Sequence, residues 1–73
     1  MNLIFSRKRR ELIMEIEFLK AVKIGNKIYD IGERLEIKEP QDTLMDLNED
    51  FYILIYHGLR YDVYRNAIKI IRN

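Results

Sequence analysis

The sequence predicts a mainly β protein, in which residues 14–73 form a small five-stranded barrel behind a basic arm or short helix in residues 1–13. Three observations predict this fold. Apolar and polar residues alternate with the period of a β-strand in several short runs. Glycine, asparagine and proline separate those runs, as they do at tight turns. A chain of 73 residues has room for one compact core, and closure into a barrel protects the edges of short strands.

The strongest strand pattern lies in Phe51–Tyr64, FYILIYHGLRYDVY, where two apolar and aromatic runs flank Gly58. This pattern is typical of a β-hairpin. Two registers are open. A three-residue loop over 56–58 places Ile55 opposite Leu59. A two-residue turn over 57–58 shifts the first strand by one position and turns its side chains to the other face.

The register decides which side chains of the hairpin face the core. We expect the three-residue loop, because isoleucine has no polar atom, whereas a tyrosine ring can pack flat and keep its hydroxyl in water. In that register, Ile53 faces Tyr61 and Phe51 faces Val63, with the tyrosines of the first strand on the opposite side. The two-residue turn instead gives one face made of Tyr52, Leu54 and Tyr56 beside Leu59, Tyr61 and Val63.

Strands are also predicted before this hairpin. The first runs from Met14 to Ile24 with an irregularity at residues 19–21. Gly25-Asn26 predicts a two-residue hairpin turn. A clean alternation over Arg34–Lys38 predicts a further strand, which Pro40 ends because it lacks the N–H that a ladder requires. The side chains expected to point inward are Ile16, Phe18, Val22, Ile24, Leu35 and Ile37.

Residues 39–50, EPQDTLMDLNED, predict a polar connection containing one helical turn capped by Asp42. Its acidic residues lack the spacing of a calcium-binding loop, so we interpret them as solvated rather than metal-binding. After the central hairpin we expect a short turn at residues 64–66 and a last strand at 67–71. The apolar residues expected to hold the helical turn against the core are Leu44, Met45 and Leu47.

The order of elements after Gly58 is similar to that of a known family. Gly58 is followed by the strand Leu59–Val63, the short turn Tyr64–Asn66 and a closing strand that begins at Ala67. This order resembles the SH3-like small barrels. The resemblance implies a five-stranded barrel layout. It does not imply polyproline recognition, because the ALYDY segment, paired tryptophans and binding-site proline of SH3 domains are absent from the sequence.

Residues 1–13 leave several interpretations open. The basic run 7–10 would lie in the first turn of a helix, where the macrodipole disfavours positive charge, so an arm and a short helix both stand. Residues 8–11 can be encoded by a purine-rich tract typical of a ribosome-binding sequence, and we therefore expect Met14 to be the biological start. A helix over residues 7–20 packed on an antiparallel sheet would instead give an α+β fold.

Composition excludes several classes of function. The chain has no cysteine, which removes disulfides and thiolate chemistry and is consistent with a reducing compartment. Its longest apolar run, Phe51–Tyr56, is too short to span a bilayer. The net charge is +1, but it is unevenly distributed, because residues 39–59 contain acidic residues and no lysine or arginine. We expect a cytoplasmic protein with no membrane segment, no cofactor and no metal site.

The residues that could carry out catalysis are few. His57 is the only histidine and lies beside the turn glycine, and Ser6 and Thr43 are the only hydroxyl side chains besides the tyrosines. A catalytic histidine or hydroxyl needs a neighbouring base or carboxylate, which the sequence does not supply. We therefore expect no enzyme activity.

We expect a non-catalytic protein-interaction module, of the kind that a phage or integrated element encodes as an accessory protein. The residues expected to contact its protein partner are Tyr52, Tyr56, Arg60, Tyr64 and Arg65. A homodimer is also expected, because Phe51–Tyr56 is apolar on both faces. The alternative is a nucleic-acid-binding accessory protein that uses the basic arm and a C-terminal basic edge. Its contact residues would be Arg7, Lys8, Arg9, Arg10, Lys69 and Arg72.

Overall fold

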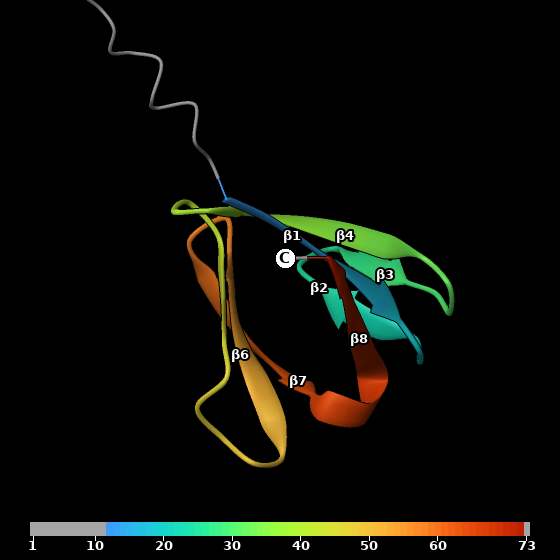
Figure 1. Cartoon of the computed structure of the whole chain (residues 1–73). Helices are drawn as coiled ribbons and strands as arrows, with labels where there is room; N and C mark the ends of the chain where they lie inside the picture. The colour runs from blue at the N-terminus through green and yellow to red at the C-terminus, as the bar shows by residue number, and fades with distance from the viewer. Residues whose placement is uncertain (1–11, 73) are drawn as a thin grey trace, which may run out of the picture.

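The computed structural model describes residues 12–72, with the side chains of residues 13–71, and within this range the chain is built from short β-strands (Figure 1). The strands are β1 (Leu12–Phe18), β2 (Val22–Ile24), β3 (Lys27–Tyr29), β4 (Arg34–Glu39), β5 (Thr43–Met45), β6 (Phe51–Tyr56), β7 (Leu59–Tyr64) and β8 (Ile68–Arg72). A 3-10 turn, η2 (Arg65–Ala67), joins β7 to β8. The strands form three antiparallel sheets with the orders β4–β1–β8, β2–β3 and β5–β6–β7.

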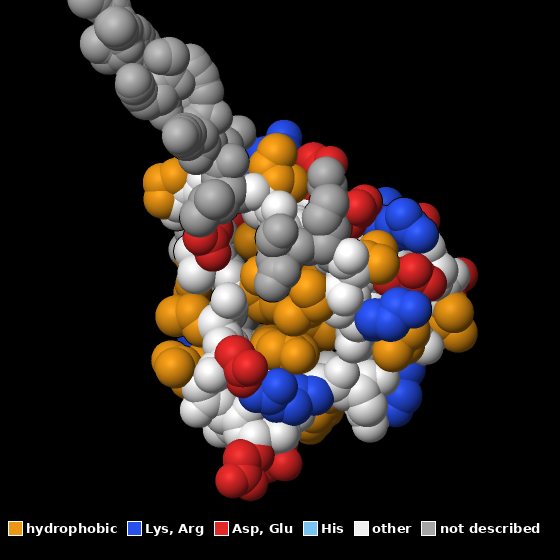
Figure 2. Space-filling view, viewed as in Figure 1, with side chains coloured by type: hydrophobic (Ala, Val, Ile, Leu, Met, Phe, Trp, Pro, Cys, Tyr) orange, Lys and Arg blue, Asp and Glu red, His pale blue; other side chains and the backbone are white. Residues whose placement is uncertain are grey.

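The mainly β prediction is confirmed, but the sheets do not close into a barrel and a count of five strands is not confirmed. Residues 19–21 separate β1 from β2, and residues 40–42 separate β4 from β5 at Pro40, which has no N–H for a ladder. Figure 2 shows hydrophobic side chains at the surface in the region between β6 and β8. The α+β alternative is wrong, because Leu12–Phe18 is a strand; residues 7–11 lie outside the described range.

The sheet β4–β1–β8 shows the alternation that the sequence predicts. Ile16 and Phe18 on β1 are fully buried, and Leu35 and Ile37 on β4 point to the same interior. On the opposite face Glu17 lies across from Arg34, with 3.7 Å between the carboxylate and guanidinium. A register shift between Glu15 and Ile16 interrupts the pairing of β1 with β8.

The hairpin β2–β3 forms the two-residue turn expected at Gly25-Asn26. Gly25 has a φ of 66°, a conformation that glycine adopts without steric cost. Ile24 lies opposite Lys27 and Val22 opposite Tyr29, as predicted.

The register predicted for the hairpin β6–β7 is wrong. The turn contains two residues, His57 and Gly58, so that Tyr56 lies opposite Leu59. Both turn residues have positive φ, as a type I′ turn requires, and this turn matches the right-handed twist of paired strands. Twist therefore decides the register, and the preference of isoleucine for the interior does not. The side chains placed on the inner face are Tyr52, Leu54, Tyr56, Leu59, Tyr61 and Val63.

The helical turn predicted in residues 39–50 is also wrong, because Thr43–Met45 is strand β5, paired with β6. Asp42 does not cap a helix. The residue is 5% exposed, and its carboxylate accepts a hydrogen bond of 3.0 Å from the backbone N–H of His57. Leu44 packs against the core as expected, whereas Leu47 is exposed. A three-residue strand is too short to show a period of its own, so its pairing with β6 was not visible in the sequence.

The core lies between the sheets β4–β1–β8 and β5–β6–β7, with the β2–β3 hairpin packed against it. Tyr29 of that hairpin stacks on Phe18, with ring centroids 4.8 Å apart. Each fully buried aliphatic or phenyl side chain contributes about 1.5–3 kcal/mol relative to exposure. The buried apolar residues are Ile16, Phe18, Ile24, Tyr29, Leu35, Ile37, Leu54, Val63, Ala67 and Ile68.

The two ends of the described chain meet in the first sheet, where β1 lies between β4 and β8. The turn expected after β7 is η2, and the backbone N–H of Leu19 donates to the carbonyl of Ala67 at 2.7 Å, which ties this turn to the end of β1. The predicted boundary at Met14 falls inside β1, whose first residue Leu12 lies opposite Glu39. Of the arm predicted in residues 1–13, residues 12 and 13 belong to β1, and residues 1–11 lie outside the described range.

Candidate functional site

The outer face of the sheet β5–β6–β7 carries an apolar surface. Because Leu54 and Val63 point into the core, the residues that alternate with them point away from it. The four central side chains of this outer face are half-buried, and none belongs to the buried core or to the residues packed against it. These outer apolar residues are Met45, Phe51, Ile53 and Ile55, and we call them, with the exposed Tyr64, the outer patch.

The cross-strand pairs show how the outer patch is assembled. Met45 lies opposite Ile53, and Phe51 lies opposite Tyr64, which is 68% exposed. At the β7 side of the sheet, Arg60 and Asp62 form an ion pair of 3.1 Å between Nε and Oδ1. An apolar centre with a charged border is the arrangement of a protein interface.

A shallow hollow extends the outer patch at the end of the hairpin where Phe51 faces Tyr64. It has a volume of about 610 Å³ and is bordered by Glu49, Asp50, Asp62, Arg65 and Asn66 in addition to the two rings. The hollow is wide open to solvent, and none of the side chains that line it is held in place by a buried polar residue. It therefore offers a rim for contacts with a macromolecule rather than an enclosed site for a small ligand.

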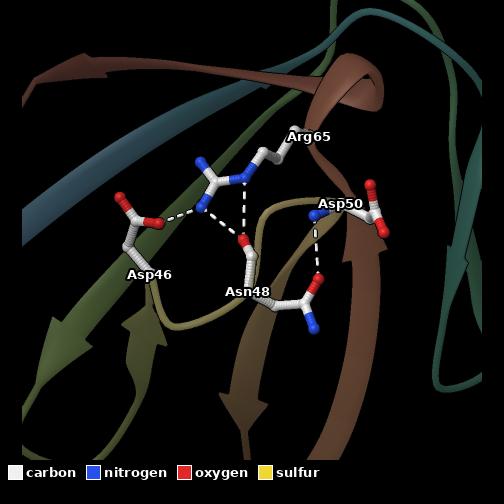
Figure 3. Close-up of polar contacts among 4 residues, drawn as sticks. All are labelled: Asp46, Asn48, Asp50 and Arg65. Atoms are coloured by element: carbon white, nitrogen blue, oxygen red, sulfur yellow. Dashed lines mark hydrogen bonds and ion pairs between the residues drawn. The ribbon is translucent and has the colours of Figure 1, made fainter.

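Arg65 fixes the loop that borders this hollow (Figure 3). Its Nε and Nη2 donate to the carbonyl oxygen of Asn48 at 2.9 and 2.6 Å, and Nη2 also pairs with the carboxylate of Asp46. The guanidinium carbon lies 4.5 Å from the centre of the Tyr52 ring. The hydrogen bond to Asp46 raises the pKa of Arg65, so the guanidinium stays charged. Nε and Nη2 are thus used within the chain, and this role is structural.

The loop itself is closed by two further hydrogen bonds. The side-chain Oδ1 of Asn48 accepts from the backbone N–H of Asp50 at 2.8 Å, as drawn in Figure 3. The backbone N–H of Arg65 donates to the carbonyl of Asp50 at 3.1 Å. The contacts between Arg65 and this loop could not be predicted from the sequence, because Arg65 and Asn48 are 17 positions apart.

A second hollow, of about 530 Å³, is lined by residues of β3, β4 and the β6–β7 turn. Tyr56 borders it and stacks on His57, with ring centroids 4.1 Å apart. Burial raises the pKa of Tyr56 above its usual 10.0, and its contacts with Tyr29 and Asp42 raise this pKa further. These groups hold the turn to the core. The lining residues are Lys27, Tyr29, Arg34, Leu35, Glu36, Lys38, Gln41, Asp42, Tyr56 and His57.

The five residues predicted to contact a protein partner lie on two different faces. Tyr52 and Tyr56 are half-buried on the inner side of β6, and Arg65 lies against Tyr52. Arg60 and Tyr64 point outward from β7. The two-residue turn causes this separation. Sequence reasoning missed Phe51, Ile53 and Ile55 as outer residues for the same reason. It missed Met45, which was expected to hold a helical turn against the core, because Thr43–Met45 is strand β5.

Of the residues predicted for nucleic-acid binding, Lys69 is the one whose side chain lies in the described range, and it is exposed on β8. Arg7, Lys8, Arg9, Arg10 and the side chain of Arg72 lie outside that range. Within residues 12–72 no three His, Asp or Glu side chains are grouped closely enough to hold a metal ion. The same part of the chain contains no helix that is long and apolar enough to cross a membrane.

Comparisons with protein-family models, with curated proteins and with solved structures find no match for this chain.

Proposed function

We propose that this protein is a small, non-catalytic protein-interaction module whose contact surface is the outer patch. One observation carries the proposal: Met45, Phe51, Ile53 and Ile55 form an apolar sheet face that lies outside the core. Apolar side chains grouped on one exposed face are typical of a binding surface. Tyr64 adds an exposed aromatic side chain of the type enriched in interfaces.

The order of the strands supports an SH3-like layout for the module. The hairpin β6–β7 leads through η2 into β8, and β8 returns to lie beside β1. β4 borders β1 on its other side and is followed by β5, which begins the second sheet. The polyproline specificity of SH3 domains is no part of the proposal, because its sequence elements are absent.

The test is affinity capture of a partner from host lysate, with and without nuclease treatment, with the full chain as bait. The informative variant is Ile53→Ser combined with Ile55→Ser, because both side chains are half-buried on the outer patch and outside the core. The matched control is Ile28→Ser, which removes an isoleucine that is exposed on β3. Circular dichroism verifies that each variant is folded.

We expect the wild-type chain to capture a protein partner even after nuclease treatment. The control variant should capture the same partner, and the double variant should not. Equal capture by the double variant and the wild-type chain would show that the outer patch is not the contact surface. Recovery of nucleic acid alone would favour the nucleic-acid alternative.

A further inference from the structure

β7 is an edge strand whose outer side has no partner within the described chain. It pairs with β6 on one side only. In a two-residue hairpin the residues that flank the turn exchange both hydrogen bonds, so Leu59, Tyr61 and Val63 are bonded to β6. The N–H and C=O of the alternate residues, Arg60 and Asp62, therefore point away from β6. No backbone hydrogen bond outside the sheets involves either of them.

The pattern of charge on this edge is self-complementary. In an antiparallel pair of two β7 strands, only residues with outward-pointing backbone groups can exchange hydrogen bonds. Arg60 then faces Arg60, Asp62 faces Asp62, or Arg60 faces Asp62 of the second copy. The backbone groups of Tyr64, at the end of β7, also point outward, but a register with Asp62 opposite Tyr64 forms no charge pair. The first two registers place like charges directly opposite each other, which destabilises a sheet, and the third places two opposite-charge pairs across the axis.

The remaining positions of the third register are also compatible. Tyr61 of each copy lies on the two-fold axis, opposite its equivalent. Leu59, which is 60% exposed, lies opposite Val63 of the second copy. Edges that are protected from pairing usually carry unbalanced charge, such as lysine, or proline. This edge instead carries one positive and one negative side chain, already paired at 3.1 Å within the strand.

We propose that β7 pairs antiparallel with β7 of a second copy of this chain, with Arg60 of each copy opposite Asp62 of the other. The contact is two-fold symmetric, so it forms a closed dimer in which the free β7 edge of each copy is paired. It joins the two sheets into one of six strands in the order β5–β6–β7–β7–β6–β5. The two outer patches then lie on the same face of a continuous sheet, which doubles the surface proposed for partner binding.

The test measures the oligomeric state of the full chain by sedimentation equilibrium over a range of concentrations. Arg60→Asp and Asp62→Arg each place like charges at both facing pairs. We expect either substitution to raise the dimer dissociation constant by about tenfold or more. The double variant Arg60→Asp/Asp62→Arg exchanges the two charges and restores the complementarity, so its dissociation constant should return toward the wild-type value. Lys20→Asp, an exposed charge reversal away from β7, is the matched control.

Amide hydrogen exchange tests whether the contact lies on the β7 edge. If it does, the N–H groups of Arg60 and Asp62 should become protected from exchange as the protein concentration rises. A wild-type chain that stays monomeric would overturn the proposal, as would a dimer that neither single variant weakens, or one whose Arg60 and Asp62 amides remain unprotected. The outer-patch test is independent of these results. A monomeric chain that still captures its partner through Ile53 and Ile55 would remove the dimer and leave the interaction module standing.

Discussion

Tyr56 lies directly opposite Leu59 across the turn of the β6–β7 hairpin, and this pair sets the register of both strands. The two residues between them, His57 and Gly58, have φ values of 53° and 81°. Non-glycine residues rarely adopt positive φ, although histidine, asparagine and aspartate do so more readily than others. The register therefore depends on a turn position where β-branched residues are strongly disfavoured.

Substitution of His57 should test this dependence. Asn favours the type I′ conformation, whereas Val is strained at positive φ, so we expect His57→Val to lower the free energy of unfolding by about 1 kcal/mol relative to His57→Asn. Both variants lose the stacking on Tyr56, so their difference reports the backbone preference. Urea unfolding measures it. Equal stability of the two variants would mean that His57 does not hold this conformation in solution.

Asp42 supports the same turn from a distance of 15 positions in the sequence. Its buried carboxylate accepts from the N–H of His57, and Asp42→Ala removes that acceptor. We expect a loss of about 1–3 kcal/mol in the free energy of unfolding, with faster amide exchange at His57. Asp42→Asn keeps an oxygen acceptor and should lose less. Gln41→Ala, at the exposed neighbouring position, is the control and should change neither the free energy of unfolding nor the amide exchange at His57. A similar loss of stability in Gln41→Ala would show that the hydrogen bond to His57 is not the cause of the loss in Asp42→Ala.

The parts of the fold that could be predicted from the sequence depend on local signals. Gly25-Asn26 lies between two alternating runs, and the predicted pairs of the β2–β3 hairpin are confirmed. Leu35 and Ile37 alternate with charged residues, so the buried face of β4 was clear. In both cases the residues that form the element also specify its inner face.

The hairpin β6–β7 could not be predicted in the same way, because every residue from Phe51 to Tyr56 is apolar or aromatic and no polar residue marks the outer face. Its register follows from the preferred twist of the turn. This one-position difference also moved the candidate site: the tyrosines expected to contact a partner lie on the inner side, and isoleucines expected in the core form the outer patch.

Arg65 should be needed for the order of the loop that includes Asn48. The guanidinium reaches the Asn48 carbonyl with two nitrogen atoms and also pairs with Asp46, a geometry that the single ammonium group of lysine cannot reproduce. We expect Arg65→Lys to accelerate amide exchange at Asp50, whose N–H is bonded to Asn48, and at position 65 itself. Hydrogen-exchange NMR measures both rates.

The matched control for this substitution is Arg60→Lys, because Arg60 is an exposed arginine that pairs with Asp62 on its own strand. The control should leave exchange at Asp50 unchanged. Unchanged exchange at Asp50 in Arg65→Lys would show that the loop is ordered without the guanidinium.

Tyr56 should make the stability of the fold sensitive to high pH. Burial raises the pKa of its hydroxyl above the usual 10.0, with further contributions from Tyr29 and Asp42, while Lys38 opposes them. The folded chain thus holds this proton more tightly than the unfolded chain does. Its contribution to stability is fully present below pH 10.0 and is lost as the pH rises through the pKa of the folded state.

The comparison of wild type with Tyr56→Phe isolates this effect. At neutral pH the variant should be less stable by about 0.5–1.5 kcal/mol, because it loses the interaction of the hydroxyl with Tyr29. Above pH 10.0 the wild-type chain should lose stability more steeply, so the difference between the two should narrow. Urea unfolding at several pH values on both sides of 10.0 measures it. Parallel curves for the two proteins would mean that the hydroxyl of Tyr56 titrates equally in the folded and unfolded chains.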